Sequence, residues 1–215
     1  MSHIEYEIAL DLGQTCPNQA FTWLSQLPNC TYVRTTQLLN IYFDTPNHDL
    51  KHAKAALRLR YDTQANCWLQ TLKTAGHQRN GMSARQEWEV ALPTSDGDAP
   101  PRWQIELFTP DAQSYLAPIA DKMRPLFHTD FKRDIFEYKL DDEQYEWAID
   151  RGEIRSAHEE HPARISIQDL EIELKQGNVD SMRALAERAR TALNAQPQYL
   201  SKAARGYALF SNAPK

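Results

Sequence analysis

An alternation of apolar and charged residues restricts the fold of this 215-residue chain more than any other feature. A period of two is the side-chain period of a β-strand, in which neighbouring residues point to opposite faces. In one segment, Leu57 and Leu59 alternate with Arg58 and Arg60. The pattern predicts eight strands, over residues 3–10, 39–45, 55–62, 67–74, 82–92, 131–140, 144–151 and 165–175. An antiparallel sheet with one apolar face would account for it.

Helical periodicity occurs in four other stretches of the chain. Apolar residues spaced three or four apart predict helices over residues 17–27, 112–126, 179–193 and 201–208. The best candidate for a domain boundary is the loop 93–101, but the strand pattern resumes beyond it. We therefore predict a single α+β domain over residues 1–210, followed by a short tail over residues 211–215.

The charge, hydropathy and cysteine content exclude several classes of protein. There are 24 lysines and arginines against 29 aspartates and glutamates, and the net charge of −5 argues against a surface built to bind nucleic acid. No apolar run approaches the roughly 20 residues that cross a membrane. The three cysteines form no C-x-x-C pair, which favours a reducing compartment. We expect a cytoplasmic protein with neither a nucleic acid nor a membrane as its partner.

Glycine is scarce, and this restricts how the chain could bind a phosphate group. Gly76 and Gly81 have the spacing of a phosphate-binding loop, but Met82 stands where that loop needs a lysine. We interpret residues 76–83 as a turn. Side chains, rather than a glycine-rich backbone, would then have to hold any phosphate ligand.

The charged faces of the predicted strands are nearly pure in sign. Glu5 and Glu7 share one face, and Arg58 and Arg60 share another, although adjacent like charges repel each other. A charged face that only keeps a protein soluble usually mixes residue types. For any single strand, such a solvated face is the alternative to a binding site. Grouped carboxylates suit Mg²⁺ or Mn²⁺, and grouped arginines suit phosphate oxygens. Together they indicate a cavity for a metal–polyphosphate complex.

Ordered motifs over nearly the whole chain resemble those of the CYTH-domain family, the triphosphate tunnel metalloenzymes. The matching segments are EYE at 5–7, NIYFDTP at 40–46, ALRLR at 56–60, WLQTLK at 68–73, RQEWEV at 85–90, DRGEI at 150–154, LEIELK at 170–175 and SKAARGYAL at 201–209. Their order and spacing make the resemblance specific. It implies a closed eight-stranded antiparallel β-barrel, with helices packed on the outside and a charged tunnel within.

The resemblance also implies a role for each charged residue of the tunnel. The carboxylates would bind Mg²⁺ or Mn²⁺, and they are Glu5, Glu7, Glu87, Glu89, Asp150, Glu171 and Glu173. The cations would bind a small triphosphate, and they are Arg58, Arg60, Lys73, Arg85, Arg133, Lys175, Lys202 and Arg205. Lys73 and Lys175 would also take part in catalysis. The implied reaction is hydrolysis of the terminal phosphate of inorganic tripolyphosphate, or of a similar small triphosphate, by a metal-activated water.

Ala9 is a departure from the family pattern that bears on function. The family's opening signature is E-x-E-x-K, and Ala9 stands where the lysine belongs. Lys175 has the same offset from Glu171 and Glu173, so we hypothesise that it partly compensates. The missing lysine keeps open a non-catalytic module that binds polyphosphate or a nucleotide. The other activities of the family keep open a thiamine triphosphatase or a class IV adenylate cyclase.

Overall fold

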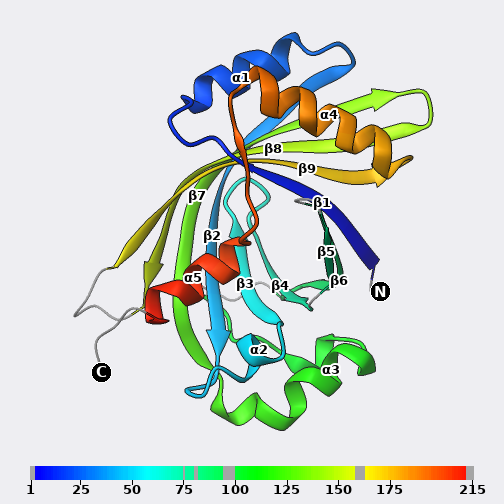
Figure 1. Cartoon of the computed structure of the whole chain (residues 1–215). Coiled ribbons are helices and arrows are strands. Elements are labelled where there is room, and N and C mark those ends of the chain that lie inside the picture. The colour runs from blue at the N-terminus through cyan, green and yellow to red at the C-terminus, as the bar shows by residue number, and fades with distance from the viewer. Residues whose placement is uncertain (1–2, 75, 80–81, 94–99, 158–162, 212–215) are drawn as a thin grey trace.

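One antiparallel sheet organises the molecule. The computed structural model describes residues 3–74, 76–79, 82–93, 100–157 and 163–211. Eight strands of the sheet follow one another around a closed ring (Figure 1). In spatial order they are β1 (His3–Asp11), β9 (Arg164–Gln176), β8 (Glu143–Ser156), β7 (Arg124–Leu140), β2 (Cys30–Asp44), β3 (Ala56–Asp62), β4 (Cys67–Lys73) and β6 (Met82–Ala91). The closed eight-stranded antiparallel barrel is confirmed.

Pairing of β1 with β6 closes the ring. Glu5 of β1 lies opposite Arg85 of β6, and on the other edge of β1 Glu7 lies opposite Glu173 of β9. Directly opposite residues of an antiparallel pair project to the same face of the sheet. The closure therefore gathers the charged residues of β1, β6 and β9 on the inner face of one barrel.

Two short strands extend the sheet beyond the ring. β5 (His77–Arg79) pairs with β6, and β10 (Gln196–Pro197) pairs with β1. Since β5 lies within the segment that we interpreted as a turn, that interpretation is wrong for residues 77–79, and residues 80–81 lie outside the described part of the chain.

Three helices cover the outside of the barrel. α1 (Pro17–Gln26) and α4 (Val179–Ala192) pack on the outward side chains of β1, β8 and β9, around the fully buried Trp147. α3 (Pro110–Leu116) covers β3, β4 and β6 around Trp88. Figure 1 shows α1 and α4 together at the top and α3 at the bottom. In the described part of the chain, no helix is long and apolar enough to cross a membrane.

The predicted helix over residues 112–126 is shorter in the structure. α3 ends at Leu116, and a 3₁₀ helix, Ala117–Lys122, follows it. Pro118 accounts for the change, because a proline has no N–H to donate to the carbonyl group four residues earlier in the helix. The helix therefore gives way to a tighter turn before β7 begins.

Other elements differ from the predictions mainly in length. β2 starts at Cys30 and β7 at Arg124, both earlier than their alternating patterns begin. These two strands pair with each other along almost their full lengths, so tertiary pairing extends them beyond the alternation. Two short segments, α2 (Asp49–His52) and a 3₁₀ turn (Ile105–Leu107), had no periodic pattern to predict them.

The C-terminal helix α5 (Lys202–Ser211) packs against the inner face of the barrel. Its Tyr207 belongs to an apolar cluster with Leu38, Phe127 and Phe131. These strand residues lie at inward-facing positions of β2 and β7, and α5 contacts β7, β8 and β9. Outside packing is thus confirmed for α1, α3 and α4, whereas α5 covers the interior. Beyond Ser211, the expected tail lies outside the described residues.

A substitution of Gly206 tests how closely α5 approaches the barrel. A Cβ atom there would lie 2.2 Å from a ring carbon of the buried Phe127. We expect Gly206→Ala to destabilise the protein by about 1–3 kcal/mol in urea denaturation, despite the better helix propensity of alanine. Adding Phe127→Leu should make room for the methyl group, so the double variant should lose less stability than the sum of the two single variants. Strict additivity would contradict this packing.

Candidate active site

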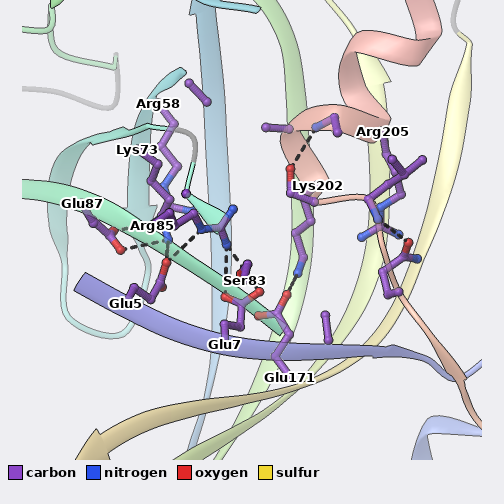
Figure 2. A pocket seen from close by; sticks show the side chains of 18 of the residues that line it. Glu5, Glu7, Arg58, Lys73, Ser83, Arg85, Glu87, Glu171, Lys202 and Arg205 are labelled. Atoms are coloured by element: carbon purple, nitrogen blue, oxygen red, sulfur yellow. Dashed lines mark hydrogen bonds and ion pairs between the residues drawn. The ribbon is translucent and has the colours of Figure 1, made fainter. Parts of the chain in front are cut away.

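A charged cavity of about 930 Å³ occupies the interior of the barrel. Inward side chains of the barrel strands and one face of α5 line it (Figure 2). The lining includes all but one of the charged residues that the sequence predicted: Glu5, Glu7, Arg58, Arg60, Lys73, Arg85, Glu87, Glu89, Arg133, Glu171, Glu173, Lys175, Lys202 and Arg205. Barrel closure thus brings together residues that are up to 200 positions apart in sequence.

Asp150 is the predicted site residue that does not line the cavity. Its side chain is fully buried, and both of its oxygens accept hydrogen bonds from the Arg133 guanidinium, at 2.7 and 2.6 Å. The Lys202 ammonium lies 2.7 Å from one of the same oxygens. Asp150 therefore sits behind these two cations and fixes their positions.

Several lining residues were missed by the sequence-based prediction. Glu146 and Asp169 both line the cavity. Glu146 lies on the same face of β8 as Asp150, and Asp169 lies on the same face of β9 as Glu171. The same alternation would have identified both of them. Lys51 and Lys54 also line the cavity, but they lie between β2 and β3, where no strand pattern points to them.

One group of ion pairs surrounds Glu5 on β1. The Lys73 ammonium lies 2.8 Å from Glu5 and 3.0 Å from Glu87, so it joins β4 to both β1 and β6. Arg85 donates to Glu5 at 3.1 Å. Burial alone would raise the pKa of Glu5, but Lys73 and Arg85 hold it well below its ordinary value. Glu5 is therefore ionised, and its charge is balanced by neighbouring strands.

A second group of ion pairs surrounds Glu171 on β9. One oxygen accepts from Arg133 at 2.6 Å, and the other contacts the Lys202 ammonium of α5. Burial would raise the pKa of Glu171, but Lys202 and Arg133 lower it below its ordinary value. Arg205, one turn farther along α5, forms an ion pair with Asp169. The C-terminal helix thus supplies two of the cations around β9.

Glu7 lies between these two groups and is poorly neutralised (Figure 2). Its nearest cation is Arg85, at 3.4 Å. Burial, together with the charge of Glu171, raises the pKa of Glu7 to about 7. Near Glu7, the cavity therefore has negative charge that its own cations do not fully neutralise.

Arg60 shows the opposite imbalance. Its Nε donates to Asn40 at 2.9 Å, and among the described residues no carboxylate lies within ion-pair distance of its guanidinium. Burial, with repulsion from Arg58 and Arg133, lowers the pKa of Arg60 to about 10. A partly buried cation without a counter-ion is well placed to bind an anion such as a phosphate oxygen.

Lys175 and Ala9 both line the cavity, but at different depths. Ala9 lies opposite Glu171 in the pairing of β1 with β9. The Lys175 side chain is 38% exposed, and its ammonium lies 2.7 Å from Glu173 and 4.0 Å from Glu146. Lys175 is therefore at the rim and already forms ion pairs.

The donor set of the cavity suits a hard divalent cation. The carboxylates of β1 and β9 supply only oxygen ligands, which Mg²⁺ and Mn²⁺ prefer. Within the described residues, no three acidic, histidine or cysteine side chains already converge as a metal-binding group. The ion pairs explain this, because lysines and arginines occupy the carboxylate oxygens. The residues fit such a metal chemically, provided that some ion pairs open.

The comparisons with known proteins define the family. The CYTH domain model matches residues 3–207, so the chain belongs to the CYTH-domain family. Over 172 residues it is 33% identical to a protein of Haemophilus influenzae named inorganic triphosphatase. The match covers 80% of this chain but 46% of that relative, so the chain spans about half the relative's length.

Solved structures share the fold. HpAC1 from Hippeastrum, assigned as an adenylyl cyclase and described as having a dominant triphosphatase activity, has a TM-score of 0.61 and 17% identity, with 95% of each chain covered. A Bacillus halodurans protein assigned as an adenylate cyclase has a TM-score of 0.59 and 18% identity, with 95% of this chain and 97% of that chain covered.

The raised pKa of Glu7 predicts how stability changes with pH. Between about pH 4.5 and 7 the folded protein holds a proton on Glu7 that the unfolded chain has released. The contribution of this proton to the free energy of unfolding is therefore complete below the pKa of Glu7 in the unfolded chain, and it is lost as the pH rises through about 7. Glu7→Gln imitates the protonated carboxyl group, so in metal-free urea denaturation it should be more stable than the wild type by about 1–3 kcal/mol at pH 8. The two proteins should converge towards pH 4.5, and a difference independent of pH would contradict the assignment.

Proposed function

We propose that this chain hydrolyses the terminal phosphate of inorganic tripolyphosphate, or of a related small triphosphate, with the help of Mg²⁺ or Mn²⁺. The observation that carries the proposal is Arg60, a partly buried cation without a carboxylate partner among the described residues, in a cavity also lined by the carboxylates of β1 and β9. The named activity of the Haemophilus influenzae relative supports the choice of substrate.

The cations of the cavity would hold the triphosphate. Arg58 and Arg60 project from β3, and Arg85 and Arg133 project from β6 and β7, so they approach the interior from several sides. A guanidinium can bind two phosphate oxygens at once through parallel N–H groups, which fixes orientation as well as position. Lys202 and Arg205 would complete the set from α5.

The carboxylates would hold the metal. Glu5, Glu7, Glu171 and Glu173 belong to the adjacent strands β1 and β9, and Glu87 and Glu89 of β6 would assist them. When bound, the metal would polarise a phosphate oxygen and lower the pKa of a water molecule. The residues of this chain would position the phosphate chain for in-line attack and neutralise the charge that develops on it.

Two lysines would take part in catalysis. Lys73 lies between Glu5 and Glu87 in the lining of the cavity, where its ammonium would contact a bound phosphate oxygen. Lys175 would partly replace the cation that Ala9 does not supply. Asp150, which is behind Arg133 and Lys202, would act through these cations rather than as a metal ligand.

A non-catalytic module that binds polyphosphate or a nucleotide is the alternative, and Ala9 is the observation that favours it. The deciding experiment measures phosphate release from tripolyphosphate, ATP and thiamine triphosphate with Mg²⁺ or Mn²⁺, together with cyclic AMP formation from ATP. The proposal predicts metal-dependent release from tripolyphosphate. Tight binding of tripolyphosphate without release would support the alternative.

We also propose that the protein is located in the cytoplasm. All three cysteines are free thiols, as a reducing cytoplasm would keep them. A small triphosphate would be the partner of the cavity, and we propose no nucleic acid or membrane partner.

Removal of the Arg60 charge should separate substrate binding from stability. We expect Arg60→Met to raise KM for tripolyphosphate by about 10- to 100-fold, because a charged hydrogen bond to phosphate is lost. The same variant should be as stable as the wild type or more so, since an uncompensated buried cation is removed. Arg34→Met, which removes a cation paired with Asp62 instead, is the matched control and should leave KM unchanged. An unchanged KM in Arg60→Met would contradict the anion site.

A rescue experiment tests the compensation by Lys175. We expect Lys175→Met to lower kcat by about tenfold, if this cation at the rim of the cavity takes the place of the family lysine. Ala9→Lys in the Lys175→Met background should restore most of the activity, because it returns a cation to the lining between β1 and β9. No recovery in the double variant would count against compensation.

A further inference from the structure

Lys202 has an unusual position among the cations of the cavity. Its ammonium contacts three carboxylates, with Asp150 at 2.7 Å, Asp169 at 3.3 Å, and Glu171 as the closest of the three. Its side chain is 9% exposed. The three carboxylates compensate the charge of this buried ammonium, and Lys202 is in turn a counter-cation for each of them.

The present contacts of Glu171 oppose metal binding, because a cation already lies beside each of its oxygens. One of its oxygens contacts Lys202 and the other accepts from Arg133 at 2.6 Å, so both oxygens are engaged. Arg133 belongs to the barrel wall and is held by two hydrogen bonds to Asp150. Lys202 is attached by a single ammonium on a flexible stem. Of the two cations, Lys202 is the one that can leave.

The carboxylates that Lys202 would leave behind keep other partners. Asp150 retains its two hydrogen bonds from Arg133, and Asp169 retains its ion pair with Arg205. Neither buried carboxylate would lose its only cation, which would be costly. The helix itself can stay in place, because the Tyr207 hydroxyl donates to the buried Asp44 at 2.7 Å.

We propose that Lys202 is an internal counter-cation for Glu171, and that a divalent cation displaces it and turns its ammonium towards the substrate phosphates. The inference rests on the proposed function, in which Glu171 is a metal ligand. It adds that the metal and Lys202 compete for one carboxylate, so metal binding prepares a cation for the phosphate.

Calorimetric titration of the substrate-free protein with Mn²⁺ tests the competition without relying on activity. Lys202→Met should bind Mn²⁺ about tenfold more tightly than the wild type, because the competing ammonium is gone. With saturating Mn²⁺, the same variant should have a higher KM for tripolyphosphate, whereas binding of tripolyphosphate in EDTA should change less, because there the wild-type ammonium stays on Glu171. A residue that only supports the fold would weaken both, and one that only binds substrate would leave Mn²⁺ affinity unchanged.

Two further variants serve as controls. Lys202→Arg keeps the charge and should bind Mn²⁺ nearly as the wild type does. Arg190→Met removes an exposed cation that pairs with Glu187 on α4, so it matches the change in net charge and should have no effect. If Lys202→Met does not fold well enough for titration, Lys202→Gln, read by the rise in melting temperature on addition of Mn²⁺, should show a larger rise than the wild type.

The outcomes separate this inference from the proposed function. If the wild type binds Mn²⁺ and hydrolyses tripolyphosphate but Lys202→Met binds Mn²⁺ no more tightly, the inference is overturned and the function stands. If the wild type neither binds Mn²⁺ nor releases phosphate, the proposed function fails, and the inference fails with it.

Discussion

The desolvation of charged side chains inside a closed barrel is the constraint on which the rest of this structure depends. A buried carboxylate or guanidinium is costly unless an opposite charge lies beside it. The barrel meets this requirement by interleaving strands of opposite charge, so that Glu5 of β1 contacts Lys73 of β4 and Arg85 of β6. On the other side, Glu171 contacts Arg133 of β7 and Lys202 of α5. Charges that join different elements in this way also hold the barrel and its C-terminal helix together.

Glu7 and Arg60 depart from this internal balance, and they carry opposite charges. The nearest cation to Glu7, Arg85, is 3.4 Å away and is shared with Glu5, and the pKa of Glu7 rises to about 7 because of burial and the charge of Glu171. Arg60 has no carboxylate at ion-pair distance among the described residues, and its pKa falls to about 10 because of burial and repulsion from Arg58. A bound cation would relieve the first and a bound anion the second. A metal–triphosphate complex supplies both charges in one ligand.

The alternation of residues predicted the inner face well because closure of the barrel turns every second residue of each strand towards the cavity. Arg58 and Glu173 line the cavity as predicted, and Glu146 and Asp169 follow the same pattern and were overlooked. Features that depend on tertiary packing could not be predicted from this pattern. Helical periodicity does not show which face of α5 is buried or which strands bury it. The inward position of Tyr207 depends on an apolar end of the barrel, and the burial of Asp150 behind Arg133 depends on pairing across β7 and β8.

A crystal structure with Mn²⁺ and tripolyphosphate, in which anomalous scattering locates the metal, would show whether the barrel holds a metal–triphosphate complex. We expect Mn²⁺ among the carboxylates of β1 and β9, a phosphate on the Arg60 guanidinium, and the Lys202 ammonium no longer in contact with Glu171. Tripolyphosphate bound outside the barrel, or Mn²⁺ bound away from these carboxylates, would contradict it.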